Sequence, residues 1–359
     1  MVARKRDFLL LTPDSVSPSR PEVRVIGVFN PAAIDVGSEL HVLARVVEAP
    51  IEKRPGFIGL PRWTIGGNAI EIDWLAADRH NPVDARAVEL LPEGILRLTF
   101  TSHLRLFRFD SEMKLLSPPA GELSVLPETQ QELYGIEDPR IMVLDGWYYF
   151  TYVAVSRHGA CTALARTRDF REIQRLGIIF PPENKDVVLF PERIDGRYAA
   201  LHRPNPRMHF TRPEVWIASS DNLIDWGGHS PLVLPRVEAW QAGRVGGGCP
   251  PVRTERGWLV IYHGNDRLPG MPPSVIGSYY GAALVLDERY PHRVIGVADR
   301  PILVPEMPYE VRGFVPRVVF PTAILDRGDR WLVVYGAADE NVAAVELDKS
   351  SLWDSIRML

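Results

Sequence analysis

Cysteine is scarce in this sequence. Of its 359 residues only Cys161 and Cys249 are cysteines, and they lie far apart in the chain. Two distant cysteines form neither a disulfide framework nor a zinc site, so we expect both to be free thiols and predict no metal site.

Long apolar runs are also missing. Near the start, Arg4, Lys5 and Arg6 precede only five apolar or nearly apolar residues, Phe8 to Thr12. That stretch is too short for a signal-peptide core, and no later run reaches the length that crosses a bilayer. We therefore expect a cytoplasmic protein that has no membrane partner.

Neither sign of charge is in large excess. The formal net charge is -4 at pH 7, with 24% charged and 46% hydrophobic residues. This composition gives no basic stripe that would attract a nucleic acid, so we predict no nucleic-acid partner and expect any anion binding to be local. The hydrophobic fraction is typical of a globular protein with a large core.

No long segment follows the helical period of 3.6 residues. Apolar residues alternate instead, as in residues 258–262, which predicts strands and little helix. One unit recurs along the chain: a short polar or proline-containing turn, an alternating strand, a Gly or Asp turn, and a second strand rich in aromatic residues. The plainest copies begin at residues 137, 190 and 249, weaker copies begin at 29 and 320, and a further candidate begins at 83.

The spacing of these copies indicates a β-propeller. The positions compared are Pro31, Ala85, Pro139, Pro191, Pro251 and Pro321. The steps between them are 54, 54, 52, 60 and 70 residues, which is the period of a propeller blade. Because the two chain ends commonly share one blade, we predict a single all-β domain over residues 1–359, a five-bladed β-propeller. An antiparallel sandwich is the alternative.

The repeat starts are where a site is expected, since a propeller gathers them around one axis. Asp138 is a candidate acid for breaking a glycosidic bond. It is equally well explained as a turn aspartate that caps the backbone before Pro139 and pairs with Arg140. The same ambiguity holds for Glu137, with ion pairing favoured.

Three cations stand at the ends of strands in successive units. If Lys185, Arg203 and His263 meet, they form a pocket that suits phosphate, because Arg offers a planar fork of donors and Lys a point charge. The more common alternative is that Arg203 and His263 satisfy carbonyls or neighbouring acids. The run 246–248 of three glycines lacks the spacing of a nucleotide-binding loop, so we interpret it as tight backbone.

Several motifs, in one order, resemble glycoside hydrolase family 130, the β-mannoside phosphorylases and related mannosidases. They are GIEDPRI (135–141), KDVVLFPERIDGRYAALHRP (185–204), IYHG (261–264) and YGAALVLD (280–287). The resemblance extends from residue 29 to residue 339 and implies a five-bladed propeller. It implies that Asp138 is the general acid, acting through the mannose 3-hydroxyl, and that inorganic phosphate is a co-substrate with no other cofactor.

The resemblance also implies roles for the cations. Lys185, Arg203 and His263 match phosphate-binding positions, and Tyr280 is expected to close that pocket. Hydrolytic members carry glutamates at positions like Arg203 and His263. We therefore expect phosphorolysis with inversion, giving α-mannose 1-phosphate, in preference to hydrolysis.

A further set of residues is expected to bind the sugar. Asn30, Arg45 and Asp339 match family residues that grip the mannosyl unit, and the segment 102–105 resembles a motif that faces the same funnel. The substrate-binding candidates are Asn30, Arg45, His103, Arg105, Glu137 and Asp339. Many members that act on β-1,4-mannosides have an aromatic residue in place of Glu137, so a β-1,2 linkage is slightly favoured.

The predicted partners are a mannose-containing oligosaccharide and inorganic phosphate, and homo-oligomerisation is left open. Three other functions compete with this one. The chain is alternatively a β-mannoside hydrolase, a non-catalytic carbohydrate-binding propeller, or a pentose-processing propeller. The last uses two or three carboxylates and has less need of a cationic pocket.

Overall fold

The structure is a computed structural model that describes residues 2–205, 210–235, 240–268, 270–272 and 274–359. In these residues the chain consists mainly of antiparallel strands. Helix is limited to α1 (Pro308–Val311), α2 (Lys349–Asp354) and the 3-10 turns η1 (Pro13–Ser15), η2 (Ala77–Arg79) and η3 (Gln130–Glu132). The alternating patterns therefore form strands, as predicted. None of the described helices is long and apolar enough to cross a membrane.

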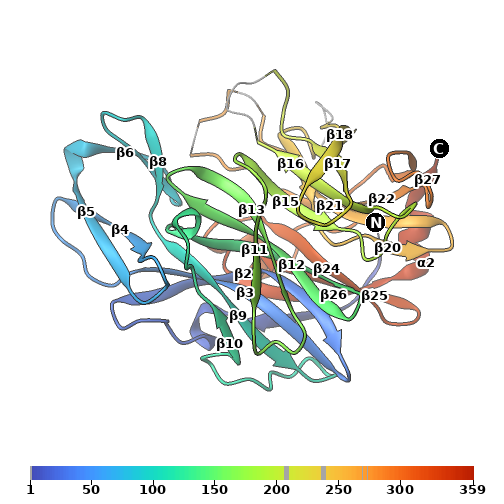
Figure 1. Cartoon of the computed structure of the whole chain (residues 1–359), viewed down its shortest axis with the longest axis horizontal. Coiled ribbons are helices and arrows are strands. Elements are labelled where there is room, and N and C mark those ends of the chain that lie inside the picture. Colours follow the sequence, from blue (N-terminus) through green and yellow to red (C-terminus); the bar gives the residue numbers. More distant parts are fainter. Residues whose placement is uncertain (1, 206–209, 236–239, 269, 273) are drawn as a thin grey trace.

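Five sheets hold most of the strands, and we number them in chain order (Figure 1). Sheet I contains β2 (Val23–Val36), β3 (Glu39–Pro50), β9 (Thr101–Phe109) and β10 (Leu123–Val125). Sheet II contains β11 (Gly135–Leu144), β12 (Trp147–Ser156), β13 (Gly159–Thr167) and β14 (Gln174–Phe180). Sheet III contains β15 (Asn184–Leu189), β16 (Tyr198–Pro204), β17 (Val215–Ser220) and β18 (Trp226–Val233).

The last two sheets contain the chain ends. Sheet IV contains β19 (Arg244–Gly247), β20 (Val252–Thr254), β21 (Gly257–Asn265), β22 (Tyr279–Leu286), β23 (Val294–Ala298) and the C-terminal β27 (Ile356–Met358). Sheet V contains β24 (Val319–Asp326), β25 (Arg330–Ala337), β26 (Asn341–Asp348) and the N-terminal β1 (Arg4–Leu11). The first strand of the chain thus completes a sheet built from late strands, whereas the last strand, β27, joins sheet IV.

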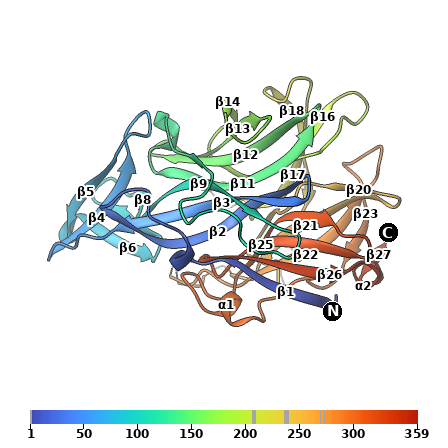
Figure 2. The same ribbon diagram turned by 90° about the horizontal axis from the view of Figure 1, so that it is seen from below.

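Residues 51–100 form an insertion between β3 and β9, which are neighbours in sheet I. Its strands are β4 (Phe57–Trp63), β5 (Ile70–Ala76), β6 (His80–Asp84), β7 (Ala87–Leu90) and β8 (Ile95–Leu98). They form a two-stranded and a three-stranded sheet that project from one end of the molecule, opposite the two termini (Figure 2). The candidate repeat start at residue 83 is therefore wrong: it is the β6–β7 hairpin of this insertion, whose alternating strands imitate the repeat.

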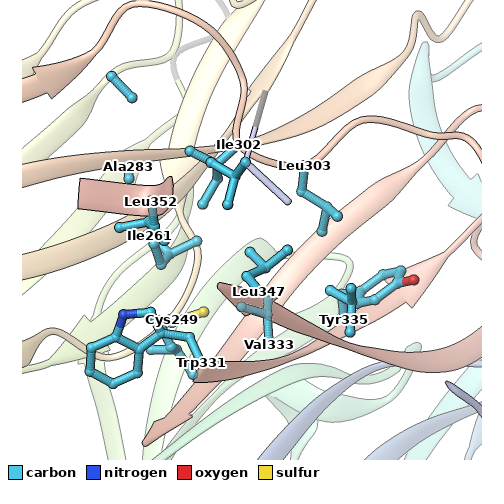
Figure 3. Packing of buried hydrophobic residues seen from close by; sticks show 14 of the residues in the cluster. Cys249, Ile261, Ala283, Ile302, Leu303, Trp331, Val333, Tyr335, Leu347 and Leu352 are labelled. Carbon is cyan, nitrogen blue, oxygen red and sulfur yellow. The ribbon is translucent and has the colours of Figure 1, made fainter. Parts of the chain in front are cut away.

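The core is divided among the gaps between sheets. Five hydrophobic clusters each join two sheets: I and II around Leu104 and Tyr152, II and III around Leu164 and Val187, III and IV around Leu201 and Trp258, IV and V around Ile261 and Val333, and V and I around Leu332 and Val42. Figure 3 shows the cluster between sheets IV and V, which also contains Cys249. Burial of one large apolar side chain stabilises the fold by about 1.5–3 kcal/mol.

Both cysteines are buried free thiols, as predicted. Burial raises the pKa of Cys161 to about 11, so this thiol is protonated at neutral pH. The two residues therefore act as small core side chains.

Candidate active site

A cavity of about 1300 Å³ is lined by residues from all five sheets and from the insertion. Its polar lining includes Asn30, Arg45, Arg86, Glu137, Asp138, Lys185, Asp186, Arg203, Arg244 and Asp339. A concave site with convergent polar groups is the default location for ligand binding.

A backbone bulge recurs where the edge strands of four sheets border the cavity. The pairing register shifts after Phe29 in β2, after Glu137 in β11, after Lys185 in β15 and after Pro321 in β24. At three of these places a short polar residue has left-handed backbone: Asn30 (φ 45°), Asp138 (φ 49°) and Asp186 (φ 56°). Asn and Asp tolerate this conformation, and a bulge re-aims the side chain beside it.

This comparison corrects one predicted repeat start. In sheet III the equivalent of Asp138-Pro139 is Asp186-Val187, which lies before the proline at 191 that we used. The sequence concealed the equivalence because a valine occupies the position after the left-handed residue, where sheets I and II have proline.

Asp138 is held through one of its two carboxylate oxygens. The Nδ2 of Asn30 and the Nη1 of Arg45 both donate to Oδ1 of Asp138, each at 3.0 Å. Oδ2 has no hydrogen-bond partner in the described part of the chain. The carboxylate does not pair with Arg140, which instead donates to the Asp138 backbone carbonyl at 2.6 Å. Asp138 therefore presents one free oxygen to the cavity.

Glu137 lies beside Asp138 and binds two cations. Its Oε1 accepts from Nη2 of Arg45 at 2.7 Å and its Oε2 accepts from Nζ of Lys185 at 3.3 Å. Burial alone would raise the pKa of Glu137, but Arg45 and Lys185 outweigh it and hold the pKa below its usual value. Glu137 is therefore ionised at neutral pH and orients Arg45 and Lys185.

Asp339 lies in the turn between β25 and β26 and completes this group. We call Asn30, Arg45, Glu137, Asp138 and Asp339 the Asp138 cluster. Burial raises the pKa of Asp339 to about 6; Arg86 and Arg45 act against this rise, and Asp138 and Glu137 add to it. The cluster thus places two further carboxyl groups close to Asp138.

Asp186 collects a second group, the Asp186 cluster, which consists of Asp186, Arg140, Arg203 and His263. Oδ2 of Asp186 lies 2.8 Å from Nη1 of Arg203 and 3.5 Å from Nε2 of His263, and its Oδ1 lies 3.9 Å from Nη2 of Arg140. Burial lowers the pKa of His263 to about 3; Asp186 opposes this shift, and Arg203 and Arg140 reinforce it. The imidazole is therefore neutral at pH 7.

Glycines permit both clusters to pack closely. A Cβ atom at Gly246 would collide with Oδ2 of Asp186 and with the His263 ring, and a Cβ atom at Gly336 would collide with Oδ1 of Asn30. Only glycine leaves the space that these side chains occupy. The predicted tight backbone at residues 246–248 is confirmed.

Arg244 was not identified from the sequence. It begins β19 and lies two residues before Gly246, which pairs with His263, so its side chain is on the strand face that borders the Asp186 cluster. In the described residues its guanidinium has neither an ion-pair nor a hydrogen-bond partner. Arg45, Lys185 and Arg203 each contact a carboxylate, whereas Arg244 at the cavity wall has no carboxylate partner among the described residues.

Four predicted site residues do not line the cavity: His103, Arg105, His263 and Tyr280. His103 is fully buried against Glu48 and Trp63, and Arg105 donates to the backbone of Ser17. The hydroxyl of Tyr280 donates to Asp266 at 2.9 Å.

The strand alternation explains the position of Tyr280, since it is the neighbouring Tyr279 that faces the cavity. The structure therefore gives His103, Arg105 and Tyr280 no direct contact with a ligand in the cavity. His263 lies behind Arg203.

Comparisons with known proteins identify the family of this chain. The model of the family described as beta-1,4-mannooligosaccharide phosphorylase, Glyco_hydro_130, matches residues 117–357. The chain belongs to glycoside hydrolase family 130. A family-130 relative of similar length is the beta-1,2-mannobiose phosphorylase of Listeria innocua, which is 34% identical over 98% of this chain and 97% of its own.

Two further similarities fit the same family. The solved structure of the Listeria innocua beta-1,2-mannobiose phosphorylase in complex with beta-1,2-mannobiose is similar to this chain, with a TM-score of 0.89 and 32% identity. The match covers 98% of this chain and 99% of the chain in that structure. A 1,2-beta-oligomannan phosphorylase from Thermoanaerobacter is 36% identical over 63% of this chain and 72% of its own.

Proposed function

We propose that this protein is an inverting β-mannoside phosphorylase, which transfers a terminal mannosyl unit to inorganic phosphate and releases α-mannose 1-phosphate and a shortened sugar. One observation carries the proposal. A single cavity holds a carboxylate with one free oxygen, Asp138, together with the cations of Lys185, Arg203 and Arg244. The phosphorylase name of the relative that aligns over nearly its whole length supports it.

Asp138 is proposed as the general acid. Because Asn30 and Arg45 both occupy Oδ1, the proton that Asp138 donates resides on Oδ2. This proton passes to the mannose 3-hydroxyl oxygen while the hydroxyl proton passes to the leaving glycosidic oxygen. The bond from that oxygen to the anomeric carbon breaks as a phosphate oxygen bonds to the same carbon from the opposite face.

Phosphate is proposed to bind at Arg203, Lys185 and Arg244. Arg203 and Lys185 each contact a carboxylate, whereas Arg244 has no such partner among the described residues and adds a further positive charge for a dianion. The neutral His263 positions Arg203 from behind, at 3.3 Å between its Nε2 and Nη1 of Arg203. This arrangement requires no metal or organic cofactor.

The principal alternative is a hydrolase on the same scaffold. A hydrolase needs a carboxylate free to activate water on the face opposite the leaving group. Asp186, the carboxylate among the proposed phosphate-binding cations, is 3% exposed and is held between Arg203 and Arg140. The paired state of Asp186 therefore favours phosphate over water as the nucleophile.

A β-1,2-linked mannoside is the proposed substrate. The relative that aligns over nearly its whole length carries this linkage in its name, and Glu137 is an ion-paired carboxylate at the site where an aromatic residue was expected for β-1,4-mannosides.

The proposed architecture is a five-bladed β-propeller in which sheets I to V are the blades. The five hydrophobic clusters support it, because they join the sheets in a closed cycle from I through V and back to I. The pairing of β1 with β26 supplies the closure that propellers use. The cavity then lies where the edge strands of the blades converge.

The test is product analysis of β-1,2- and β-1,4-mannobiose incubated with the pure protein, with and without inorganic phosphate. We expect α-mannose 1-phosphate from β-1,2-mannobiose only when phosphate is present. Release of free mannose alone in phosphate-free buffer would identify a hydrolase. Binding without turnover of either sugar would identify a carbohydrate-binding protein.

A further inference from the structure

The insertion forms one wall of the cavity, although it lies outside the segment that the family model matches. That segment begins at residue 117, whereas the insertion covers residues 51–100. Its three-stranded sheet contributes seven cavity-lining residues: Val83, Asp84, Arg86, Ala87, Ile95, Leu96 and Leu98. This wall is therefore built by a segment inserted between two neighbouring strands of sheet I.

Several contacts fix the insertion to the rest of the fold. The backbone N–H of Trp63 donates to the carbonyl of Leu133 at 2.8 Å, and the Trp63 side chain is fully buried. The guanidinium of Arg97 donates to Asp73 at 2.9 Å and stacks 3.7 Å above the ring of Tyr134, which itself lines the cavity. The wall is thus held in a defined position next to the catalytic residues.

Arg86 is the cationic residue on this wall, and Asp84 holds it in place. Oδ2 of Asp84 accepts from Nη2 of Arg86 at 2.8 Å, and Oδ1 accepts from the Arg86 backbone N–H at 2.8 Å and from Nε at 3.2 Å. One side of the guanidinium is thereby occupied, and 34% of the Arg86 side chain remains exposed. The pre-organised donors on the free side face the cavity.

The charges around Arg86 suit a sugar better than phosphate. Asp84 neutralises Arg86, and Asp339, Glu137 and Tyr279 are further groups within electrostatic reach. The groups that lie against Asp186 are instead Arg203, His263 and Arg140. Phosphate would be repelled by the carboxylates on this side, whereas uncharged hydroxyl groups accept hydrogen bonds from a guanidinium.

The depth of the wall indicates which sugar it contacts. Asn30 and Arg45, which hold Asp138 at the floor, are 5% and 6% exposed, whereas Ile95 and Leu96 on the wall are 39% and 57% exposed. A mannosyl unit that is cleaved at the floor must leave the rest of its chain nearer the opening. The wall therefore lies beside the leaving sugar, which is the part of the substrate on the far side of the cleaved bond.

We propose that the insertion is the binding wall for the leaving sugar and that Arg86, held by Asp84, donates hydrogen bonds to its hydroxyl groups. This inference rests on the proposed phosphorylase activity. Arg86 is thus a specificity-determining residue contributed by an element outside the five large sheets.

The test uses the reverse reaction, with α-mannose 1-phosphate as donor and mannose as acceptor. For Arg86→Gln we expect the KM for the acceptor to rise about tenfold while the KM for α-mannose 1-phosphate changes less than twofold, since about one charge-assisted interaction is lost. Arg86→Lys and Asp84→Asn should give smaller rises in the same constant. The matched control is Arg79→Gln, an exposed arginine of the same insertion that bonds the Leu91 carbonyl, and it should have no effect.

A second measurement separates this inference from the proposed function, because it needs no turnover. Titration calorimetry with β-1,2-mannobiose compares Asp138→Asn with the double variant Asp138→Asn/Arg86→Gln, and we expect the double variant to bind about tenfold more weakly. Equal binding, or a rise confined to the KM for phosphate or α-mannose 1-phosphate, would overturn the role of Arg86. Failure of the wild type to form α-mannose 1-phosphate would overturn the proposed function instead.

Discussion

Asp138 and Asp186 occupy equivalent bulges in two neighbouring sheets, yet their surroundings give them opposite properties. Both have left-handed backbone and both border the same cavity. Asp138 is anchored through Oδ1 alone and keeps Oδ2 free, whereas both oxygens of Asp186 face guanidinium groups. The repeated backbone thus delivers the same side chain twice, and the neighbouring cations decide whether one of its carboxylate oxygens stays free.

The comparison is tested most severely at Asp138. Asp138→Asn removes the transferable proton but keeps the shape and the acceptor for Arg45, so we expect turnover to fall by about 10³-fold or more with the melting temperature unchanged. Initial rates of phosphorolysis and thermal unfolding measure the two effects. A rate close to that of the wild type would show that Asp138 is not the acid.

The matching substitution at Asp186 should act on the fold. Asp186→Asn leaves Arg203 and Arg140 without their buried counter-charge, and loss of one partner of a buried pair costs about 3 kcal/mol of unfolding free energy. Denaturant unfolding measures this change. If Asp186→Asn kept full stability and lost only activity, the distinction between the two aspartates would fail.

Substitution of Arg244 tests whether the cation that has no partner among the described residues binds phosphate. Arg244→Gln should raise the KM for phosphate about tenfold and leave the KM for mannobiose unchanged, since one charge-assisted interaction with the anion is removed. Arg253→Gln is the control, because Arg253 belongs to the same sheet but is exposed and paired with Glu192 and Glu288 away from the cavity. Equal rises in both KM values would make Arg244 a structural residue.

The smallest effect is expected from the pH dependence of Asp339. Its folded-state pKa of about 6 exceeds the usual value of an aspartate, so the folded state binds the proton more tightly and stability falls as pH rises through the interval between them. Asp339→Asn should therefore stabilise the ligand-free protein at pH 7.5, by about 1 kcal/mol, and not at pH 4.

A matched control exists for this prediction. Asp195 has a similar left-handed backbone (φ 48°) but its side chain is 63% exposed, so Asp195→Asn should change stability at neither pH. If Asp339→Asn stabilised the protein equally at pH 4 and pH 7.5, the gain would not come from removing an ionised carboxyl group. Ionisation of Asp339 would then not destabilise the fold.

The sequence predicted the strand architecture well because its signals are local. Alternating apolar residues require no tertiary information to indicate strands, and the repeated turn marked the edge strands at Pro31, Pro139 and Pro321. It misplaced the start in sheet III, where Val187 replaces the proline, and it mistook the β6–β7 hairpin for a repeat. At residue 83 the local pattern resembles the repeat although the strands belong to the insertion. At residue 187 the proline of the pattern is missing although the bulge of the repeat is kept.

The site was predicted in part. Asp138, Lys185 and Arg203 line the cavity as expected, because they stand at strand ends that the repeat brings together. Arg244 was missed because no motif marks it: only the packing of β19 against His263 places it at the wall. Tyr280 was expected at the cavity, but Tyr279 is there, since a shift of one residue along a strand exchanges its two faces.

The sequence by itself determined that this chain forms strands, which turns recur, and which family motifs are present, since all three are properties of neighbouring residues. Only the tertiary structure decided which carboxylate keeps a free oxygen, which arginine has no partner among the described residues, and that an insertion between β3 and β9 walls the cavity. Those outcomes depend on which atoms from distant segments come within a few ångströms of one another, and charge compensation and burial are fixed only there.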